Sequence, residues 1–428
     1  MISMNQQPHP AGHLSPQESR WYIPYLVFAK WVAISLIVGL CAGLVGVLFH
    51  LVLEWCTVTR EGQPWLLWLL PLGGIVIAAL YKYIGKDQDR GTNMVLAAVR
   101  SPQEVTAVTG PLIFLSTALT HLLGGSAGRE GAALQLGGCI ASQLGKVFRL
   151  DEKDAHVIVM CGTSAAFAAL FGTPATAAIF ALEVVSVGLM YYSAIVPCTL
   201  AALTGAWLAG QFSIPPTSFS LSAVPAIGPL SLLQIALLGL LCAWVSNLFC
   251  FAMHRATSLA KRWLPNALVR AAVGGALIIL LTLLAGSRDY NGAGMEVIAR
   301  AIGGQAVPWA FLLKILFTAV TLGFGFKGGE IVPVFFTGAT FGCAAGALLG
   351  LDPGFAAALG LIAVFCGVTN CPVTSVILGV ELFGAQGLLC FTACCAVSYM
   401  LSGYGGLYGE QKIVYSKLKA EFIDIKAR

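Results

Sequence analysis

The sequence predicts an all-α membrane protein built from two related halves. Of its 428 residues, 58% are hydrophobic and only 10% are charged, whereas about 25% are charged in a typical soluble domain. A mean hydropathy of +0.85 places most of the chain in lipid. Two similar Gly-rich segments, residues 124–138 and 323–342, lie in corresponding places of the two halves. Paired, Gly-interrupted apolar segments of this kind are typical of transporters with internal repeats.

The apolar segments along the chain predict helices, and several are too short to cross a bilayer. A bilayer core about 30 Å thick needs about 20 apolar residues for each spanning helix. Shorter segments suit helices that stop partway, with their ends buried in protein or lining a polar cavity. The candidate segments are residues 25–55, 64–84, 104–124, 132–148, 155–170, 173–190, 192–212, 228–252, 268–286, 307–323, 331–350, 355–369, 372–388 and 389–402.

The pattern divides the chain into two membrane halves, residues 23–212 and 227–403. Three prolines in the polar stretch 213–226 predict the linker between them. Residues 1–22 are polar and have no apolar signal-peptide core, so we expect a cytoplasmic N-terminal tail. Only about 25 residues follow the second half, at 404–428. They are predicted to form an amphipathic basic helix and a cytoplasmic tail, without an appended regulatory domain.

The charge and cysteine patterns narrow the partners that the chain can have. The net charge is only +5 and the basic residues are scattered, so we expect no nucleic-acid partner. The 13 cysteines lie within or beside apolar runs and form no C-x-x-C pair. This favours free thiols over a metal site, and no cofactor is expected. The basic residues expected to mark cytoplasmic flanks are Lys261, Arg262, Lys412, Lys417 and Lys419.

Glu130 is the first candidate functional residue. It lies between Gly128-Arg129 and Gly131, directly before a long apolar run. An ionisable residue at membrane depth is costly and indicates a functional site. The flanking glycines permit a sharp turn that exposes backbone N–H groups, and the N-terminus of the following helix favours anions. The alternative is an interfacial carboxylate that pairs with a basic group.

Glu330 is a second candidate, in the corresponding motif of the second half. It follows Gly329 and precedes Ile331, and Pro333 fits the first turn of a new helix. The backbone N–H groups of this turn are expected to line the same anion path from the opposite side. The alternative is a carboxylate that caps the helix or lies in a loop.

Five further residues carry weaker signals. Thr92 and Asn93 follow a charged loop and can donate hydrogen bonds to an anion at a helix end, although an ordinary helix N-cap is the alternative. Tyr408 follows a Gly-rich turn that can aim its hydroxyl inward, although an interfacial aromatic would look the same. Glu183 and Glu381 end matching apolar runs, and their symmetry favours a structural role such as capping or an ion pair.

These segments together resemble the CLC family of anion channels and anion/proton antiporters. The resemblance rests on GREGA (128–132), GGEIVP (328–333), GTNMV (91–95) and LYGEQ (407–411), in this order and at these separations. It implies a CLC-like fold of two inverted-topology repeats with broken and partly spanning helices. It also implies a homodimer with one independent pore in each subunit, in which helix N-termini converge on the anion near the membrane midplane.

The resemblance assigns roles to individual residues. Glu130 matches the gating glutamate, which occupies an anion site when ionised and swings out when protonated. Thr92 falls at the serine of chloride-handling relatives, and Ile331 at a phenylalanine. Tyr408 matches the central tyrosine, with Tyr415 as the alternative if the alignment slips.

Departures from the chloride-type pattern resemble the bacterial fluoride-exporting branch of the family. GREGA has Ala132 in place of proline, Glu330 is acidic where chloride-type members are apolar, and Val184 stands where exchangers carry an internal proton glutamate. The resemblance therefore implies a fluoride/proton antiporter of the bacterial plasma (inner) membrane, with both termini cytoplasmic and with Glu330 in the proton and anion traffic. The alternative is a chloride or mixed-anion member, either an exchanger or a passive channel.

An intramembrane enzyme that uses Glu130 and Glu330 as a catalytic pair is the hypothesis of another class. It would need a metal or nucleophile set around the two carboxylates. We expect no enzyme.

Overall fold

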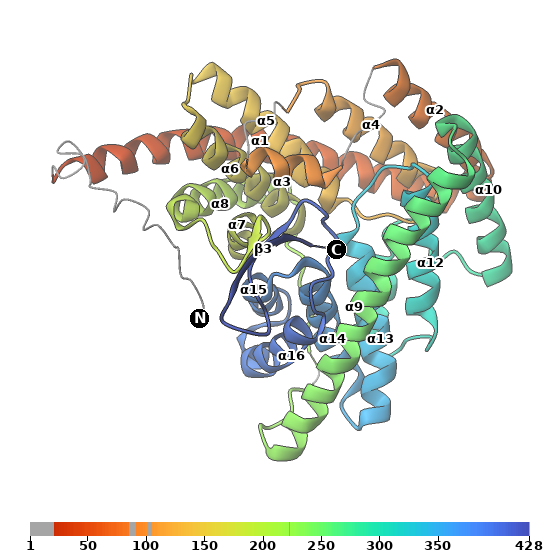
Figure 1. The fold of residues 1–428 in the computed structure, drawn as a ribbon. Helices are drawn as coiled ribbons and strands as arrows, with labels where there is room; N and C mark the ends of the chain where they lie inside the picture. Colours follow the sequence, from red (N-terminus) through yellow and green to blue (C-terminus); the bar gives the residue numbers. More distant parts are fainter. Residues whose placement is uncertain (1–20, 85–90, 101–104, 222, 428) are drawn as a thin grey trace, which may run out of the picture.

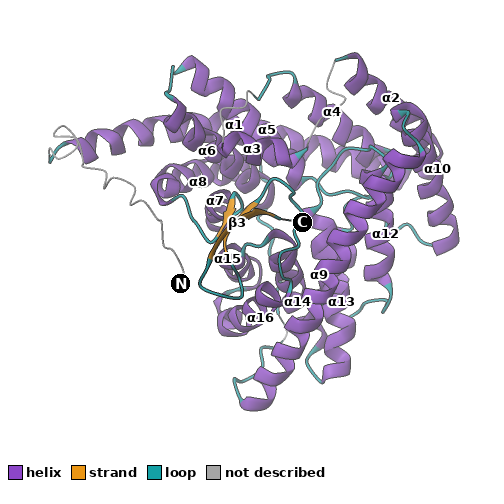
Figure 2. Ribbon diagram, in the orientation of Figure 1, coloured by secondary structure: helices purple, strands orange, loops and turns teal. Residues whose placement is uncertain are grey.

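The computed structural model describes residues 21–84, 91–100, 105–221 and 223–427, and helices dominate them (Figure 2). The helices of the first half are α1 (Ile23–Gly62), α2 (Leu70–Tyr83), α3 (Thr92–Arg100), α4 (Thr109–Leu122), α5 (Glu130–Val147), α6 (Glu152–Phe171), α7 (Pro174–Glu183) and α8 (Ile195–Gln211). Those of the second half are α9 (Pro229–Trp263), α10 (Ala267–Ala285), α11 (Met295–Ile302), α12 (Ala310–Gly323), α13 (Ile331–Leu349), α14 (Pro353–Thr369), α15 (Pro372–Phe383) and α16 (Leu388–Leu401).

The two halves repeat one arrangement, which confirms the predicted fold class. Helix α5 packs on α6 as α13 packs on α14, and α6 packs on α7 as α14 packs on α15. The long first helix of each half contacts the last one, α1 with α8 and α9 with α16. Figure 1 shows the first half, from red to yellow, packed beside the green-to-blue second half. The segment between α8 and α9 contains no helix in its described residues.

Helix lengths agree with the expectation of broken and partly spanning helices. Seven helical stretches in the described part of the chain are long and apolar enough to cross a membrane. Several other apolar helices are shorter, among them α7, α12 and α15. Short helix α11 and helix α3 were not among the candidate segments, because neither lies in a long apolar run.

Glycines let the paired helices of each half approach closely. A Cβ atom on Gly137 of α5 would overlap the carbonyl oxygen of Gly162 on α6. In the second half, a Cβ atom on Gly338 of α13 would overlap the carbonyl oxygen of Gly360 on α14. Close backbone approach at small residues is the usual way in which membrane helices associate, because lipid gives them no hydrophobic driving force.

Reciprocal helix caps join the two halves, as the symmetric spacing of Glu183 and Glu381 suggested. The Glu183 carboxylate, at the end of α7, accepts hydrogen bonds from the backbone N–H of Val373 (3.1 Å) and Thr374 (2.8 Å) at the start of α15. The Glu381 carboxylate, on α15, accepts them from the N–H groups of the first turn of α7. A carboxylate at a helix N-terminus satisfies N–H groups that have no partner within the helix.

The expectation of a C-terminal helix is wrong. Residues beyond α16 form β2 (Lys412–Tyr415) and β3 (Phe422–Lys426), which pair antiparallel, and β2 pairs parallel with β1 (Ser186–Val187). The alternation of apolar and polar side chains in FIDIK has the period of a strand and not of a helix. Residues 1–20 of the expected N-terminal tail lie outside the described residues.

Candidate functional site

The two Gly-rich motifs meet at the centre of the molecule. Gly128 and Gly329 form an antiparallel bridge, in which each backbone N–H donates to the other carbonyl oxygen at 2.7 Å. Because α5 begins two residues after Gly128 and α13 two residues after Gly329, the N-termini of both helices converge here. A Cβ atom on Gly329 would lie only 2.6 Å from the backbone nitrogen of Gly131. The close approach of the halves therefore requires glycine.

Glu130 is fully buried at this junction. Its side chain is 0% exposed, its Oε2 accepts a hydrogen bond from the backbone N–H of Arg129 at 3.0 Å, and the Val332 amide of α13 also interacts with the carboxylate. Oε1 accepts no hydrogen bond from the described part of the chain. The basic group that it approaches is Arg129, whose Nε lies 3.7 Å away. The carboxylate is thus held by both halves, and within the described structure Oε1 has only this ion pair and no hydrogen bond.

Glu330 lies beside Glu130 from the second half. It occupies the N-cap position of α13, but its side chain makes no capping hydrogen bond. Its Oε2 is buried, has no hydrogen-bond partner among the described residues, and lies 3.2 Å from where a Cβ atom on Gly131 would be. The carboxylate also interacts electrostatically with Lys327 and with Glu130. Two carboxylates therefore share one buried junction, and each has an oxygen that accepts no hydrogen bond from the described residues.

Tyr408, and not Tyr415, is the tyrosine at this junction. Its side chain is 1% exposed, and its hydroxyl has no hydrogen-bond partner in the described structure. The hydroxyl lies within electrostatic range of both Glu330 and Glu130. Tyr415 instead lies on β2, is 45% exposed and packs against Phe422. A phenol group in this position can donate a hydrogen bond to an anion between the two motifs.

Thr92 and Asn93 stand at the start of α3 but face different partners. The Thr92 hydroxyl is buried and points at the carbonyl oxygen of Gly131, at the long distance of 3.5 Å. The Asn93 Oδ1 accepts a hydrogen bond from the backbone N–H of Glu410 at 3.0 Å. Thr92 therefore belongs to the junction, whereas Asn93 joins α3 to the C-terminal segment.

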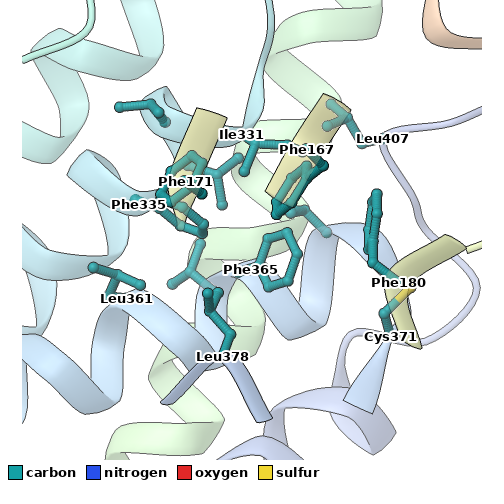
Figure 3. Close-up of a cluster of buried hydrophobic side chains, with 14 of the residues drawn as sticks. Phe167, Phe171, Phe180, Ile331, Phe335, Leu361, Phe365, Cys371, Leu378 and Leu407 are labelled. Carbon is teal, nitrogen blue, oxygen red and sulfur yellow. The ribbon is translucent and has the colours of Figure 1, made fainter. Parts of the chain in front are cut away.

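Two apolar surfaces border the site. Ile331 is fully buried and lies at the edge of a cluster of phenylalanines from α6, α7, α13 and α14 (Figure 3). A cavity of about 20 Å³ lies beside Thr92, and apart from Thr92 and Thr163 its lining residues are apolar. Val184 is one of them. The position that resembles the internal glutamate of exchangers thus faces a small, mainly apolar space.

The C-terminal segment holds Tyr408 in place. The buried Gln411 donates its backbone N–H to the Tyr408 carbonyl oxygen (2.9 Å) and its side-chain amide to the carbonyl oxygens of Val184 and Thr369. Nearby, the Lys417 ammonium donates to Asn370 and Ser402 and to the carbonyl of Tyr399. Burial lowers the pKa of Lys417 to about 8.

Two polar residues at the junction were missed in the sequence. Gln135 is buried on α5, where its amide Nε2 donates to the Gly131 carbonyl oxygen at 3.3 Å. The sequence carries one indication of this position, the four-residue spacing that puts Gln135 on the same helix face as Gly131. Residues 124–128 also spell the G-x-S-x-G pattern of serine hydrolases. The Ser126 hydroxyl instead pairs with the Thr318 hydroxyl at 3.1 Å, which joins the two halves.

Comparison with known sequences and structures places these features in one family. The sequence profile of the voltage-gated chloride channels matches residues 73–403. A chloride/fluoride channel protein of Pseudomonas syringae pv. tomato is 37% identical over 402 residues, covering 92% of this chain and 88% of that protein. The H(+)/Cl(-) exchange transporter ClcA of Vibrio cholerae is 25% identical over 385 residues, covering 82% of this chain and 81% of the transporter.

Two crystal structures share the fold. A CLC-type fluoride/proton antiporter superposes with a TM-score of 0.87 at 33% identity, over 90% of this chain and 98% of the antiporter. A slow cyanobacterial Cl-/H+ antiporter superposes with a TM-score of 0.74 at 18% identity, over 87% of this chain and 94% of that protein.

Proposed function

The chain belongs to the voltage-gated chloride channel family, and we propose that it exports fluoride across the bacterial plasma membrane in exchange for protons. One observation carries this proposal: Glu130 and Glu330 face one buried junction between helix N-termini, and each has an oxygen that accepts no hydrogen bond from the described residues. The relatives support it, since one is named a chloride/fluoride channel protein and one is a CLC-type fluoride/proton antiporter.

Glu130 is the gate and the proton carrier in this proposal. An ionised carboxylate buried away from water must be compensated by hydrogen-bond donors, a cation or a proton. In the ionised state it occupies the donors at the junction and excludes a second anion. When it takes up a proton it releases those donors, which an anion then binds. Proton and anion therefore use the same place at different moments, and this alternation couples their movements.

Glu330 serves the same traffic from the second half. Val184 stands at the position that resembles the internal proton glutamate of exchangers, so no carboxylate at that position can receive protons. Val184 borders a small, mainly apolar cavity. Glu330 instead lies beside Glu130 and interacts with it electrostatically. We assign to Glu330 the passage of protons to and from Glu130, and no chemical conversion of a substrate, so the protein is a transporter and not an enzyme.

Fluoride is the preferred anion in this proposal because of the donors available. It is small and strongly hydrated, so a site must replace its water with several donors at close range. The junction offers the backbone N–H groups that open α5 and α13, together with the hydroxyls of Tyr408 and Thr92. We further propose that the protein is a homodimer, as its resemblance to the family implies. We also propose that both termini lie in the cytoplasm, because basic residues mark the end of α9 and the C-terminal segment.

Flux measurements on purified protein in liposomes test the proposal. With fluoride inside and a fluoride electrode and pH electrode outside, we expect fluoride to leave while protons enter against their own gradient. Glu130→Gln and Glu330→Gln should abolish or uncouple the proton movement. The matched control is Glu296→Gln, at an exposed glutamate of α11. Fluoride movement without protons, or chloride movement at the same rate as fluoride, would refute the antiporter and favour the chloride or mixed-anion alternative.

A further inference from the structure

The amide side chain of Gln135 lies at the site, and the proposed function gives it no role so far. Gln135 lies on α5, one turn after Gly131, and only 2% of it is exposed. Its Nε2 lies 4.0 Å from where a Cβ atom on Gly91 would be, so the amide reaches the start of α3 beside Thr92. A polar side chain is thus buried between the N-terminal turns of α3 and α5.

The hydrogen bonding of Gln135 is incomplete. Its Nε2 reaches the Gly131 carbonyl oxygen at 3.3 Å and the Thr92 hydroxyl reaches the same oxygen at 3.5 Å, both longer than the usual 2.7–3.2 Å for such bonds. Its Oε1 is buried and has no hydrogen-bond partner in the described structure. An amide has two N–H donors and two acceptor positions, so most of this capacity is unused.

Several groups of the junction have unused hydrogen-bonding capacity. The buried oxygens without a hydrogen bond include those of Gln135, Tyr408, Glu130 and Glu330. Buried polar groups are almost always hydrogen-bonded. The Tyr408 hydroxyl can donate to an anion, whereas the carboxylate oxygens and the Gln135 Oε1 are acceptors that a proton or a water molecule can satisfy. Two weak donors, from Gln135 and Thr92, already point at one carbonyl oxygen from different helices. A small anion within reach of both donors can replace that carbonyl oxygen as their acceptor, and a charged acceptor receives stronger hydrogen bonds than a neutral one.

We propose that Gln135 is a further anion ligand, which donates an Nε2 hydrogen to fluoride when the anion passes Thr92, and that this contact favours fluoride over chloride. The proposal rests on the proposed function. The Thr92 hydroxyl and the Gln135 amide together replace two of the water molecules that surround fluoride. Because fluoride holds its hydration more strongly than chloride, losing one of these donors penalises fluoride more.

The test uses the full chain with two variants of the same side-chain length. Gln135→Met removes the donors and the acceptor, and Gln135→Glu keeps the shape but replaces the N–H donors by a carboxylate, whose negative charge repels an anion. The matched control is Gln143→Met on the same helix, because the Gln143 amide donates to the carbonyl oxygen of Val105 at 2.8 Å, away from the junction. Sodium fluoride and sodium chloride are titrated into each purified protein by calorimetry, and liposome fluxes of both anions are measured in parallel.

We expect fluoride to bind about tenfold more weakly to Gln135→Met, because losing one hydrogen bond to a charged group changes the affinity by about this factor. Fluoride should bind more weakly still to Gln135→Glu. Chloride binding should change by less than fluoride binding, and Gln143→Met should match the wild type for both anions. If a folded Gln135→Met or Gln135→Glu protein binds fluoride as the wild type does, or loses both anions equally, the inference is wrong. If the wild type itself binds chloride but no fluoride, the proposed function fails and the selectivity role of Gln135 fails with it.

Discussion

Replacing Glu183 by alanine removes the carboxylate that caps α15 from the opposite half of the molecule. Three hydrogen bonds are lost: those from the backbone N–H of Val373 (3.1 Å) and of Thr374 (2.8 Å), and one from the Thr374 hydroxyl (2.6 Å). Glu183 is only 7% exposed, so water has little access to the donors left behind. Each orphaned buried donor costs about 1–3 kcal/mol, and we expect a total loss of about 4 kcal/mol of stability.

The second half supplies an internal comparison. Glu381 caps α7 through the backbone N–H groups of Ala175 (2.9 Å) and Thr176 (2.8 Å), but its surroundings are more exposed. Ala175 is exposed, so water can hydrate its N–H when the carboxylate is removed, although Thr176 is buried. With fewer donors lost than at Glu183, Glu381→Ala should cost only about 1–2 kcal/mol, the range of an ordinary N-cap. The structure therefore predicts an order as well as a size, with Glu183→Ala the more destabilising of the pair.

Unfolding in mixed micelles, followed by circular dichroism against increasing SDS, measures both costs. The glutamine variants belong in the same series, because the amide oxygen retains part of each cap without the charge. Coupled transport per folded protein should be unchanged in Glu183→Gln, since a cap carries no proton. Loss of proton transport in Glu183→Gln with normal stability would refute the capping role and make Glu183 a proton carrier next to Val184.

Two further predictions follow from the junction and the C-terminal segment. Gly329→Ala should reduce transport at least tenfold, because the new Cβ would lie 2.6 Å from the Gly131 nitrogen and overpacking forces the backbone to shift. Liposome flux measures this loss. The control is Gly409→Ala, where the new Cβ would meet no atom of the described structure within 4 Å. Burial lowers the pKa of Lys417 to about 8, against about 10.4 in an unfolded chain. Between these two pH values the folded protein binds fewer protons than the unfolded chain, so its stability should rise with pH across that window. Thermal unfolding from pH 7 to 10.5 should show this rise in the wild type and a flatter curve in Lys417→Met.

The C-terminal segment shows where sequence reasoning failed. Its basic residues suggested an amphipathic helix, yet β2 and β3 form a sheet with β1. The strand β1 consists of only Ser186 and Val187, too short for any sequence signal. A strand is stable only when it has a partner, and β2 has two: β3, nearby in the chain, and β1, in the first half. The alternation in FIDIK was the local signal for the β2–β3 pair, whereas the pairing with β1 depends on a long-range contact.

Glu130 and Glu330 were predicted from the sequence because their signal is local: a carboxylate in a Gly-rich turn, next to an apolar helix, is costly in lipid and indicates a functional site. The two-fold repeat was likewise visible, since a bilayer imposes long apolar segments and both halves carry the same motifs. Gln135 gave no such signal, because a glutamine one turn into a helix is ordinary until its surroundings are known.

The sequence by itself determined the membrane class, the two halves and the carboxylates of the Gly-rich motifs, because composition and local spacing carry this information. Only the tertiary structure decided which groups meet. Gly128 pairs with Gly329, Glu183 caps a helix 191 residues away, and Tyr408 instead of Tyr415 enters the junction. Each of these depends on the packing of one inverted half against the other, where a partner is fixed by three-dimensional position and not by its distance along the chain.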